Sequence, residues 1–485
     1  MASSNCWKCL TRSAANQFPP TLAVRLANSF STTAVSAGPP VKTAKMLAAK
    51  GKGAKTLRIK KKAFVKTGKP PAVGERKAMR KRIVLSNTNA LEVGDLRDLS
   101  GELVDEIIQE QSETTREQEA LQAAAVEDQE NGLVGQVVGL SGLTVDSLRA
   151  VEAFKTTQGW GIFRRPAVLI RGESAVVARR MLQAAEEGET VRMVLEGEKG
   201  TGKSLMMLSA MATAFIKGWV VVNIPEAQEV TNAMTDYAAI PGTQPTLWSQ
   251  NTYIANWISQ IGKANSSVLS KINISKGLTA PITVPAGTSL FRLCELGARD
   301  PDIAWPMFQA LWKELTIPGN PPILMCLDSL SFAMQNSLYR DPDFAPIHAH
   351  DLAVIRHFVS HLSGAAKLPN GGAVLAATSR SHAPVSKSLN LAVKQAEERQ
   401  AGSDVTPRDP FEKGYDSRAD EVLASIEVMR LKGLDKNEAR GLMEYWAKSG
   451  VLRCKVDEET VAEKWALAGN GVVGEIQRAA LWMRV

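Results

Sequence analysis

Eight consecutive residues, Gly197 to Ser204, have the spacing of a phosphate-binding loop: a glycine, four variable positions, then Gly, Lys and Ser. Glycines let successive backbone N–H groups turn inward and form a nest for an anion. Lys203 is then placed to reach the β- and γ-phosphates of a nucleotide, and the hydroxyl of Ser204 to bind Mg²⁺. The residues predicted to bind the nucleotide are Glu198, Lys199, Gly200, Thr201, Gly202, Lys203, Ser204 and Leu205.

The segments on either side of the loop support this prediction. The apolar run 191–195 is typical of a buried strand, and 205–215 is apolar enough for a buried helix, which is the order that the motif requires. A second apolar run, 322–327, ends at Asp328. Nucleotide-binding folds of this kind place a metal-binding acid there, so we predict that Ser204 and Asp328 bind Mg²⁺ together.

No catalytic residue is predicted. Many AAA-type ATPases have a glutamate after the metal-binding aspartate, but this chain has Ser329 there and no acid before Asp341. A serine cannot act as a general base at neutral pH, so the sequence predicts tight binding with slow or absent hydrolysis. The segment 378–380 (Thr-Ser-Arg) ends a later apolar run and either faces the γ-phosphate or simply leaves the strand.

The net charge of +8 hides a strong asymmetry. Residues 1–82 contain 19 Lys or Arg and one acid, whereas the rest of the chain has a net charge of −10. Residues 1–40 lack acids and are rich in Ser, Thr and Ala, as in a mitochondrial transit peptide. Residues 41–82 carry 16 basic residues, which predicts a disordered arm that binds the phosphate backbone of RNA. A nuclear localisation signal is the competing interpretation of this segment.

Strand-like and helix-like segments alternate from residue 191 onward, which predicts an α/β fold with a parallel sheet flanked by helices. The segments 417–431, 435–449 and 473–483 favour a small helical C-terminal domain. The predicted organisation is a transit peptide (1–40), a basic RNA-binding arm (41–82), an acidic connecting region (83–150), a nucleotide-binding domain (151–400) and a helical domain (401–485). No apolar run is long enough to cross a bilayer, so no membrane is expected as a partner.

Other residues that could bind metals are expected to be structural. Cys294 and Cys326 lie in apolar surroundings and are predicted to be reduced core residues. The Cys6 and Cys9 pair has no second pair to complete a zinc site. Four of the five histidines cluster within 348–361 without the zinc-protease pattern.

Taken in order, several motifs resemble the death-associated protein 3 family of mitochondrial small-subunit ribosomal proteins. The similar segments are the loop 197–204, the strand 219–227 with its Ile-Pro-Glu-Ala end, Gly371-Gly372-Ala373, Leu467 to Asn470, and Glu475 to Arg478. The resemblance implies a P-loop core of the AAA-like or signal-transduction ATPase type. It also implies a place in the head of the small subunit of the mitochondrial ribosome, with bound guanine nucleotide.

The sequence therefore predicts a structural protein of the mitochondrial ribosome in the matrix. It binds GTP or GDP (alternatively ATP) with Mg²⁺, and it contacts small-subunit rRNA and neighbouring ribosomal proteins. No Asn-Lys-x-Asp motif for reading guanine is present, so the base stays open. The alternative is an AAA-type ATPase or GTPase that acts transiently in ribosome assembly.

Overall fold

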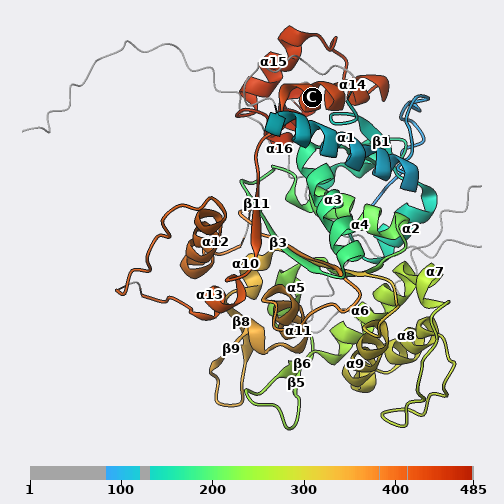
Figure 1. The fold of residues 1–485 in the computed structure, drawn as a ribbon, viewed down its shortest axis with the longest axis vertical. Helices are drawn as coiled ribbons and strands as arrows, with labels where there is room; N and C mark the ends of the chain where they lie inside the picture. Colours follow the sequence, from blue (N-terminus) through green and yellow to red (C-terminus); the bar gives the residue numbers. More distant parts are fainter. Residues whose placement is uncertain (1–82, 121–131, 382, 412, 483–485) are drawn as a thin grey trace, which may run out of the picture. The chain divides into compact units, whose positions relative to one another are not determined.

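Five parallel strands form the central sheet, in the spatial order β11–β3–β10–β7–β4 (Figure 1). Four of them confirm predicted strands: β3 (Thr190–Gly197), β4 (Val220–Ile224), β7 (Ile323–Asp328) and β10 (Gly372–Ala377). Because β10 lies between β3 and β7, Ala377 is paired with both Leu195 and Asp328. The carboxyl ends of these strands therefore meet at one edge, where parallel sheets bind ligands.

The computed structural model describes residues 83–120, 132–381, 383–411 and 413–482. All of them lie within one unit, Ala78–Val485. The transit peptide and the basic arm predicted for residues 1–82 lie outside the described residues, as do Cys6 and Cys9.

The fifth strand corrects a prediction. The segment 417–431 is helical only over α13 (Arg418–Val422), and Glu427–Leu431 is β11, which pairs in parallel with β3. Its first three residues are half-buried and Arg430 is exposed, so the strand lacks the continuous apolar run of a central strand. Its conformation is therefore difficult to predict from the sequence. The sheet consequently draws one edge strand from the segment predicted to be a helical domain.

Alternate residues of the strands enter two separate cores because side chains of a strand point to opposite faces. On β10, Ala373, Leu375 and Ala377 join a cluster with α3 (Gly172–Glu187) and α4 (Lys203–Ile216). Val374 and Ala376 join the other cluster, with α6 (Asn251–Ala264), α8 (Leu290–Arg299), α9 (Ala304–Leu315) and α11 (Ala353–Leu362). Helices thus cover both faces of the sheet (Figure 1), which confirms the predicted α/β architecture.

The last helices share a third cluster of buried residues, which includes Leu434, Met443, Trp446 and Ile476. They are α14 (Lys436–Lys448), α15 (Glu458–Leu467), α16 (Val473–Gln477) and the π-helical turn η5 (Arg478–Trp482). The predicted helices 435–449 and 473–483 are confirmed over the residues described. Helix α1 (Gly101–Ala120) lies in the segment predicted to be an acidic connecting region, and its Leu103, Val104 and Ile107 are buried.

The remaining elements connect these layers. They are β1 (Val137–Gly139), α2 (Gly142–Ala150), η1 (Thr156–Gln158), η2 (Trp160–Ile162), β2 (Ala167–Leu169), α5 (Ala227–Thr231), β5 (Ala238–Ala239), β6 (Trp248–Ser249), α7 (Ser266–Leu269), η3 (Pro301–Ile303), α10 (Leu330–Ala333), β8 (Asn336–Arg340), β9 (Pro346–His348), η4 (Ala349–Asp351) and α12 (Lys387–Gln400).

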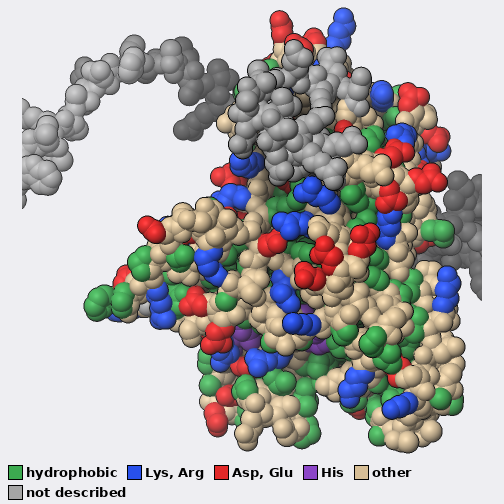
Figure 2. All heavy atoms as spheres, in the orientation of Figure 1, with side chains coloured by type: hydrophobic (Ala, Val, Ile, Leu, Met, Phe, Trp, Pro, Cys, Tyr) green, Lys and Arg blue, Asp and Glu red, His purple; other side chains and the backbone are tan. Residues whose placement is uncertain are grey.

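Charged side chains of both signs are interspersed over the face drawn in Figure 2, and neither sign forms a large continuous patch there. None of the helices among the described residues is long and apolar enough to cross a membrane.

Candidate functional site

The predicted phosphate-binding loop joins β3 to α4, as its motif requires. Gly200 and Gly202 have φ angles of +85° and +97°, in the left-handed region that favours glycine. Gly202 is also the residue before α4, so the helix begins at Lys203 with its backbone N–H groups directed toward the loop. The hydroxyl of Thr201 donates to the carbonyl of Glu198 (3.0 Å), and this hydrogen bond stabilises the turn. Loop and helix end together have the geometry of an anion site.

Lys203 lies over this loop. Its Nζ donates to the carbonyl oxygens of Gly197 and Glu198, at 2.7 Å each. The side chain is only 9% exposed. Burial lowers its pKa from the ordinary value, while the nearby carboxylates of Glu196 and Asp328 oppose the shift. The positive charge is thus held in place by oxygen acceptors at the base of the cleft, where a phosphate group would meet it.

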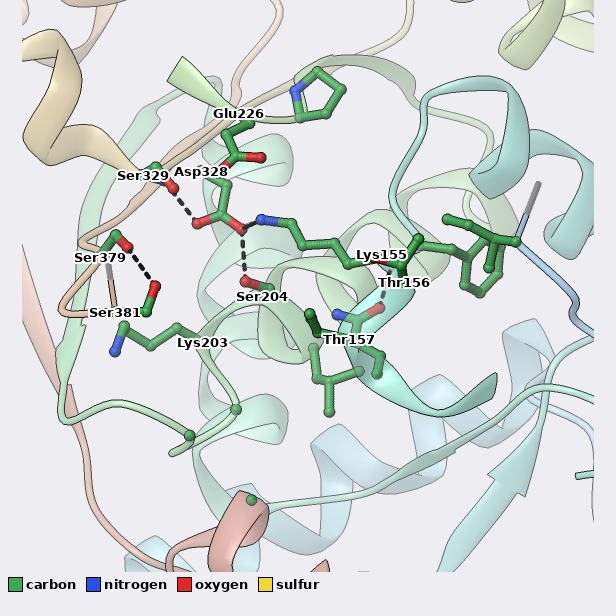
Figure 3. Close-up of a pocket in the computed structure, with 18 of the residues that line it drawn as sticks. Lys155, Thr156, Thr157, Lys203, Ser204, Glu226, Asp328, Ser329, Ser379 and Ser381 are labelled. Carbon is green, nitrogen blue, oxygen red and sulfur yellow. Dashed lines mark hydrogen bonds and ion pairs between the residues drawn. The ribbon is translucent and has the colours of Figure 1, made fainter. Parts of the chain in front are cut away.

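Ser204 and Asp328 come together from α4 and the end of β7, as predicted. The hydroxyl of Ser204 donates to Oδ2 of Asp328 at 2.6 Å, and the backbone N–H of Ser329 donates to Oδ1 at 2.7 Å (Figure 3). Asp328 is 6% exposed. A hydroxyl and a carboxylate are hard oxygen donors of the type that Mg²⁺ prefers, so the residues present fit this metal. The ammonium group of Lys155 forms an ion pair with the same Oδ2.

A buried carboxylate lies at the end of β3, directly before the loop. Glu196 is 3% exposed and accepts hydrogen bonds from the hydroxyl of Thr378 (2.5 Å) and from Nε of Arg380 (2.7 Å). These two partners lie just after β10, in the segment that was predicted either to face the γ-phosphate or simply to leave the strand. Both line the same cleft as Lys203, so the exit of β10 forms one wall of the site.

The cleft above the loop has a volume of about 1560 Å³. Of the predicted nucleotide-binding residues, Glu198 and Thr201 do not line it: Thr201 is buried inside the turn, and Glu198 supplies its carbonyl to Lys203. The others do line it, and these are Lys199, Gly200, Gly202, Lys203, Ser204 and Leu205.

Several groups of lining residues were missed by sequence reasoning, and three of them matter most for the site. The turn Lys155–Gln158 forms one wall, Glu226 and Glu229 follow β4, and Val473, Gly474, Gln477 and Arg478 come from the C-terminus. The signal for the acids was present in the strand that ends Ile-Pro-Glu-Ala, since the carboxyl end of β4 must lie beside that of β7.

The C-terminal helices contact the loop directly. The backbone N–H of Gly474 donates to the carbonyl of Gly200 at 3.0 Å. Arg171, 6% exposed, donates through one Nη1 to the carbonyl of Thr201 (2.8 Å) and through Nη2 to that of Lys432 (3.2 Å). Arg171 therefore links the loop by hydrogen bonds to the segment that leads from β11 into α14.

The position after Asp328 offers no general base. Ser329 is 2% exposed and has a φ of +62°, which is unusual for a residue other than glycine. The structure nevertheless brings Glu226 close to Asp328 (Figure 3). An acid therefore lines the cleft, although none follows Asp328 closely in the sequence.

The predicted structural cysteines and histidines lie away from this cleft. Cys294 and Cys326 are buried, and burial raises the pKa of Cys294 to about 12, so its thiol stays neutral. Within the described residues, no three His, Cys, Asp or Glu side chains are grouped so that they could hold a metal ion. His350 is 3% exposed, with Nε2 at 3.4 Å from the sulfur of Met334.

The buried histidines predict a loss of stability in acid. Burial, with the neighbouring His348, lowers the pKa of His350 from 6.5 to about 3. Below pH 6.5 the unfolded chain binds a proton that the native state does not bind, so the free energy of unfolding falls until about pH 3. One pH unit below 6.5, His350 alone should remove about 1.4 kcal/mol.

Urea unfolding at about pH 7.5 and about pH 5.5 would measure this loss. The variant His350→Gln should lose less stability than the wild type over the same interval. Glu438 acts with the opposite sign, because burial raises its pKa. Equal pH dependence in the two proteins would contradict the assignment to His350.

Comparison with known proteins adds two findings. Residues 168–479, which include the loop and Asp328, match the model of a family described as mitochondrial ribosomal death-associated protein 3. The chain is also 45% identical, over 99% of its own length and 99% of the relative's, to the small ribosomal subunit protein mS29 of Neurospora crassa.

Proposed function

Because the chain belongs to the family of mitochondrial ribosomal death-associated protein 3, we propose that it is a structural protein of the small ribosomal subunit that retains a purine nucleotide. Its place is the mitochondrial ribosome, in the matrix. The observation that carries the nucleotide proposal is the meeting of Lys203, Ser204 and Asp328, from two separate elements, in one cleft.

The position in the small subunit rests on similarity along the whole chain. The Neurospora crassa relative, a small ribosomal subunit protein by name, is matched over 99% of its length. The proposed partners are small-subunit rRNA and neighbouring ribosomal proteins in the head. Residues 1–40 are proposed as the transit peptide and 41–82 as the arm that contacts rRNA by charge. The body, with a net charge of −10 beyond residue 82, suits protein neighbours better than bare RNA.

The proposed cofactor is GTP or GDP, with ATP as the alternative, together with Mg²⁺. The loop N–H groups and Lys203 would hold the phosphates, and Ser204 and Asp328 would hold the metal, directly or through water. The metal would neutralise phosphate charge. A ligand that binds only the native state stabilises it by mass action, so a retained nucleotide would act as part of the fold.

The proposal includes a P-loop core of the AAA-like type. It is supported by the insertion of β10 between the loop strand and the Asp328 strand, which places Thr378 and Arg380 beside the phosphate loop. We also propose the predicted domain limits, with one change. The nucleotide-binding unit extends to Leu431, where β11 ends, and the helical domain follows it; 83–150 remains the connecting region.

One observation favours the rival function, a nucleotide hydrolase that acts in assembly. Glu226 and Glu229 line the cleft, and Glu226 lies near Asp328 (Figure 3). A carboxylate in such a place is able to orient or deprotonate a water molecule. Retention and turnover are therefore distinguished by measurement of the rate.

We predict that the purified full-length protein carries nucleotide but hydrolyses it very slowly. With no acid directly after Asp328, turnover of GTP or ATP should be on the order of 10⁻³ per second or slower, the range of intrinsic hydrolysis without an activating residue. Denaturation and chromatography of the released nucleotide would identify the base and the occupancy. Turnover faster than about one per second that is lost in Glu226→Gln would instead establish the hydrolase.

A further inference from the structure

Two side chains share one carboxylate oxygen at the proposed metal position. Oδ2 of Asp328 accepts a hydrogen bond from the hydroxyl of Ser204 and forms an ion pair with the ammonium group of Lys155 (Figure 3). Lys155 is distant in sequence from both partners and reaches them from the turn 155–158, which lines the same cleft. The ammonium group of Lys155 is thus paired with the carboxylate on which Mg²⁺ binding would depend.

Hydrogen bonds fix the turn that carries Lys155. Its backbone N–H donates to Oε1 of Gln158 at 2.8 Å, and the indole N–H of Trp160 donates to the same oxygen at 2.7 Å. Trp160 is 6% exposed and packs edge-on against Phe154, with ring centroids 5.0 Å apart. The turn is therefore anchored in the core, which distinguishes Lys155 from a surface lysine with many alternative positions.

The environment explains why the carboxylate needs a cation. Asp328 is 6% exposed, and an ionised carboxylate removed from water is costly unless it is paired. Lysine supplies a compact single charge on a flexible stem. The side chain of Lys155 is 26% exposed, so it has room to move into the cleft, which Glu226 and Glu229 also line.

We propose that Lys155 is a tethered cation that competes with Mg²⁺ for Asp328, so that the metal binds only after the ammonium group has moved away. This inference rests on the nucleotide-binding function proposed above. It raises the Mg²⁺ concentration at which nucleotide is retained, because the metal must displace the ammonium group from the carboxylate before it binds. It also agrees with slow turnover, since an ammonium group cannot take the place of a divalent metal in organising phosphate transfer.

The test uses the full-length protein loaded with fluorescent GDP or, separately, fluorescent ADP. Release is followed over a series of Mg²⁺ concentrations that begins in chelator. In Lys155→Met, the Mg²⁺ concentration for half-maximal retention should fall about tenfold, a coupling typical of linked binding events. Lys217→Met is the matched control, because Lys217 pairs with Asp105 at 2.6 Å outside the cleft; its midpoint should equal that of the wild type.

Each outcome decides one question. An unchanged midpoint in Lys155→Met and in Lys155→Gln, with wild-type thermal unfolding, would overturn the competition. Loss of nucleotide at every Mg²⁺ concentration in both folded variants would also overturn it and make Lys155 a phosphate ligand. If the wild type binds neither probe even at saturating Mg²⁺, the nucleotide-binding function itself fails.

Discussion

Replacement of Lys203 by alanine is expected to weaken nucleotide binding by at least about 30-fold. Removal of one member of a buried, hydrogen-bonded charge pair costs about 2–5 kcal/mol or more, and 2 kcal/mol corresponds to about 30-fold. Lys203 would form such a pair with a bound phosphate, since it is 9% exposed and two loop carbonyls at 2.7 Å hold its ammonium group in place. Its charge is the one proposed to meet the phosphates of the nucleotide.

Equilibrium binding of GDP and of ADP to purified protein would measure the effect. Lys217→Ala is the control on the same helix, because it also removes one lysine charge but lies at the far end of α4, where Lys217 is the C-cap. Thermal unfolding of both variants in the absence of nucleotide would show whether the fold is kept. Unchanged affinity in folded Lys203→Ala would contradict the phosphate role of the loop.

Replacement of Arg171 by methionine is expected to lower the free energy of unfolding by about 3–5 kcal/mol, as removal of one partner of a buried charged network usually does. Arg171 ties the phosphate loop to Lys432 by hydrogen bonds, and its Nε lies 3.9 Å from Glu438. Glu438 is 4% exposed and also accepts from the backbone N–H of Gly172 at 3.0 Å. Without Arg171, this carboxylate keeps its place but loses its charge partner.

Urea unfolding would test the role of Arg171. Arg180→Met is the control on the same helix, because its ion pair with Glu427 is about half exposed and 3.8 Å long, and such pairs contribute about 0–1 kcal/mol. Adding Glu438→Gln to Arg171→Met should recover part of the loss, since the unpaired charge is then gone. A loss below about 1 kcal/mol in Arg171→Met would show that the network does not hold the loop.

Local chemistry explains why part of the site was predictable. The loop and Asp328 are recognisable because glycine conformation, a cationic side chain and a strand-ending carboxylate each leave a short pattern in the sequence. The parallel sheet follows from alternating apolar segments. These features need only neighbouring residues to be read, and all of them are present in the structure.

The rest of the site depends on contacts between distant segments. Nothing near Lys155 in the sequence indicates that its ammonium group pairs with Asp328, because the turn that carries it is positioned by Trp160 and Gln158. Gly474 reaches Gly200 only because the C-terminal helices pack beside the loop. The strand β11 was misread as helix for a related reason: pairing with β3, rather than local pattern, decides its conformation.

The most direct test of the proposed function is sedimentation of mitochondrial lysate on a sucrose gradient, with nucleotide extracted from the fractions that contain the protein. We predict that the protein sediments with the small ribosomal subunit, resists moderate salt, and carries one purine nucleotide per chain. A protein that sediments free of the subunit, or leaves it in moderate salt and turns over added nucleotide, would contradict the structural role and favour the transient hydrolase.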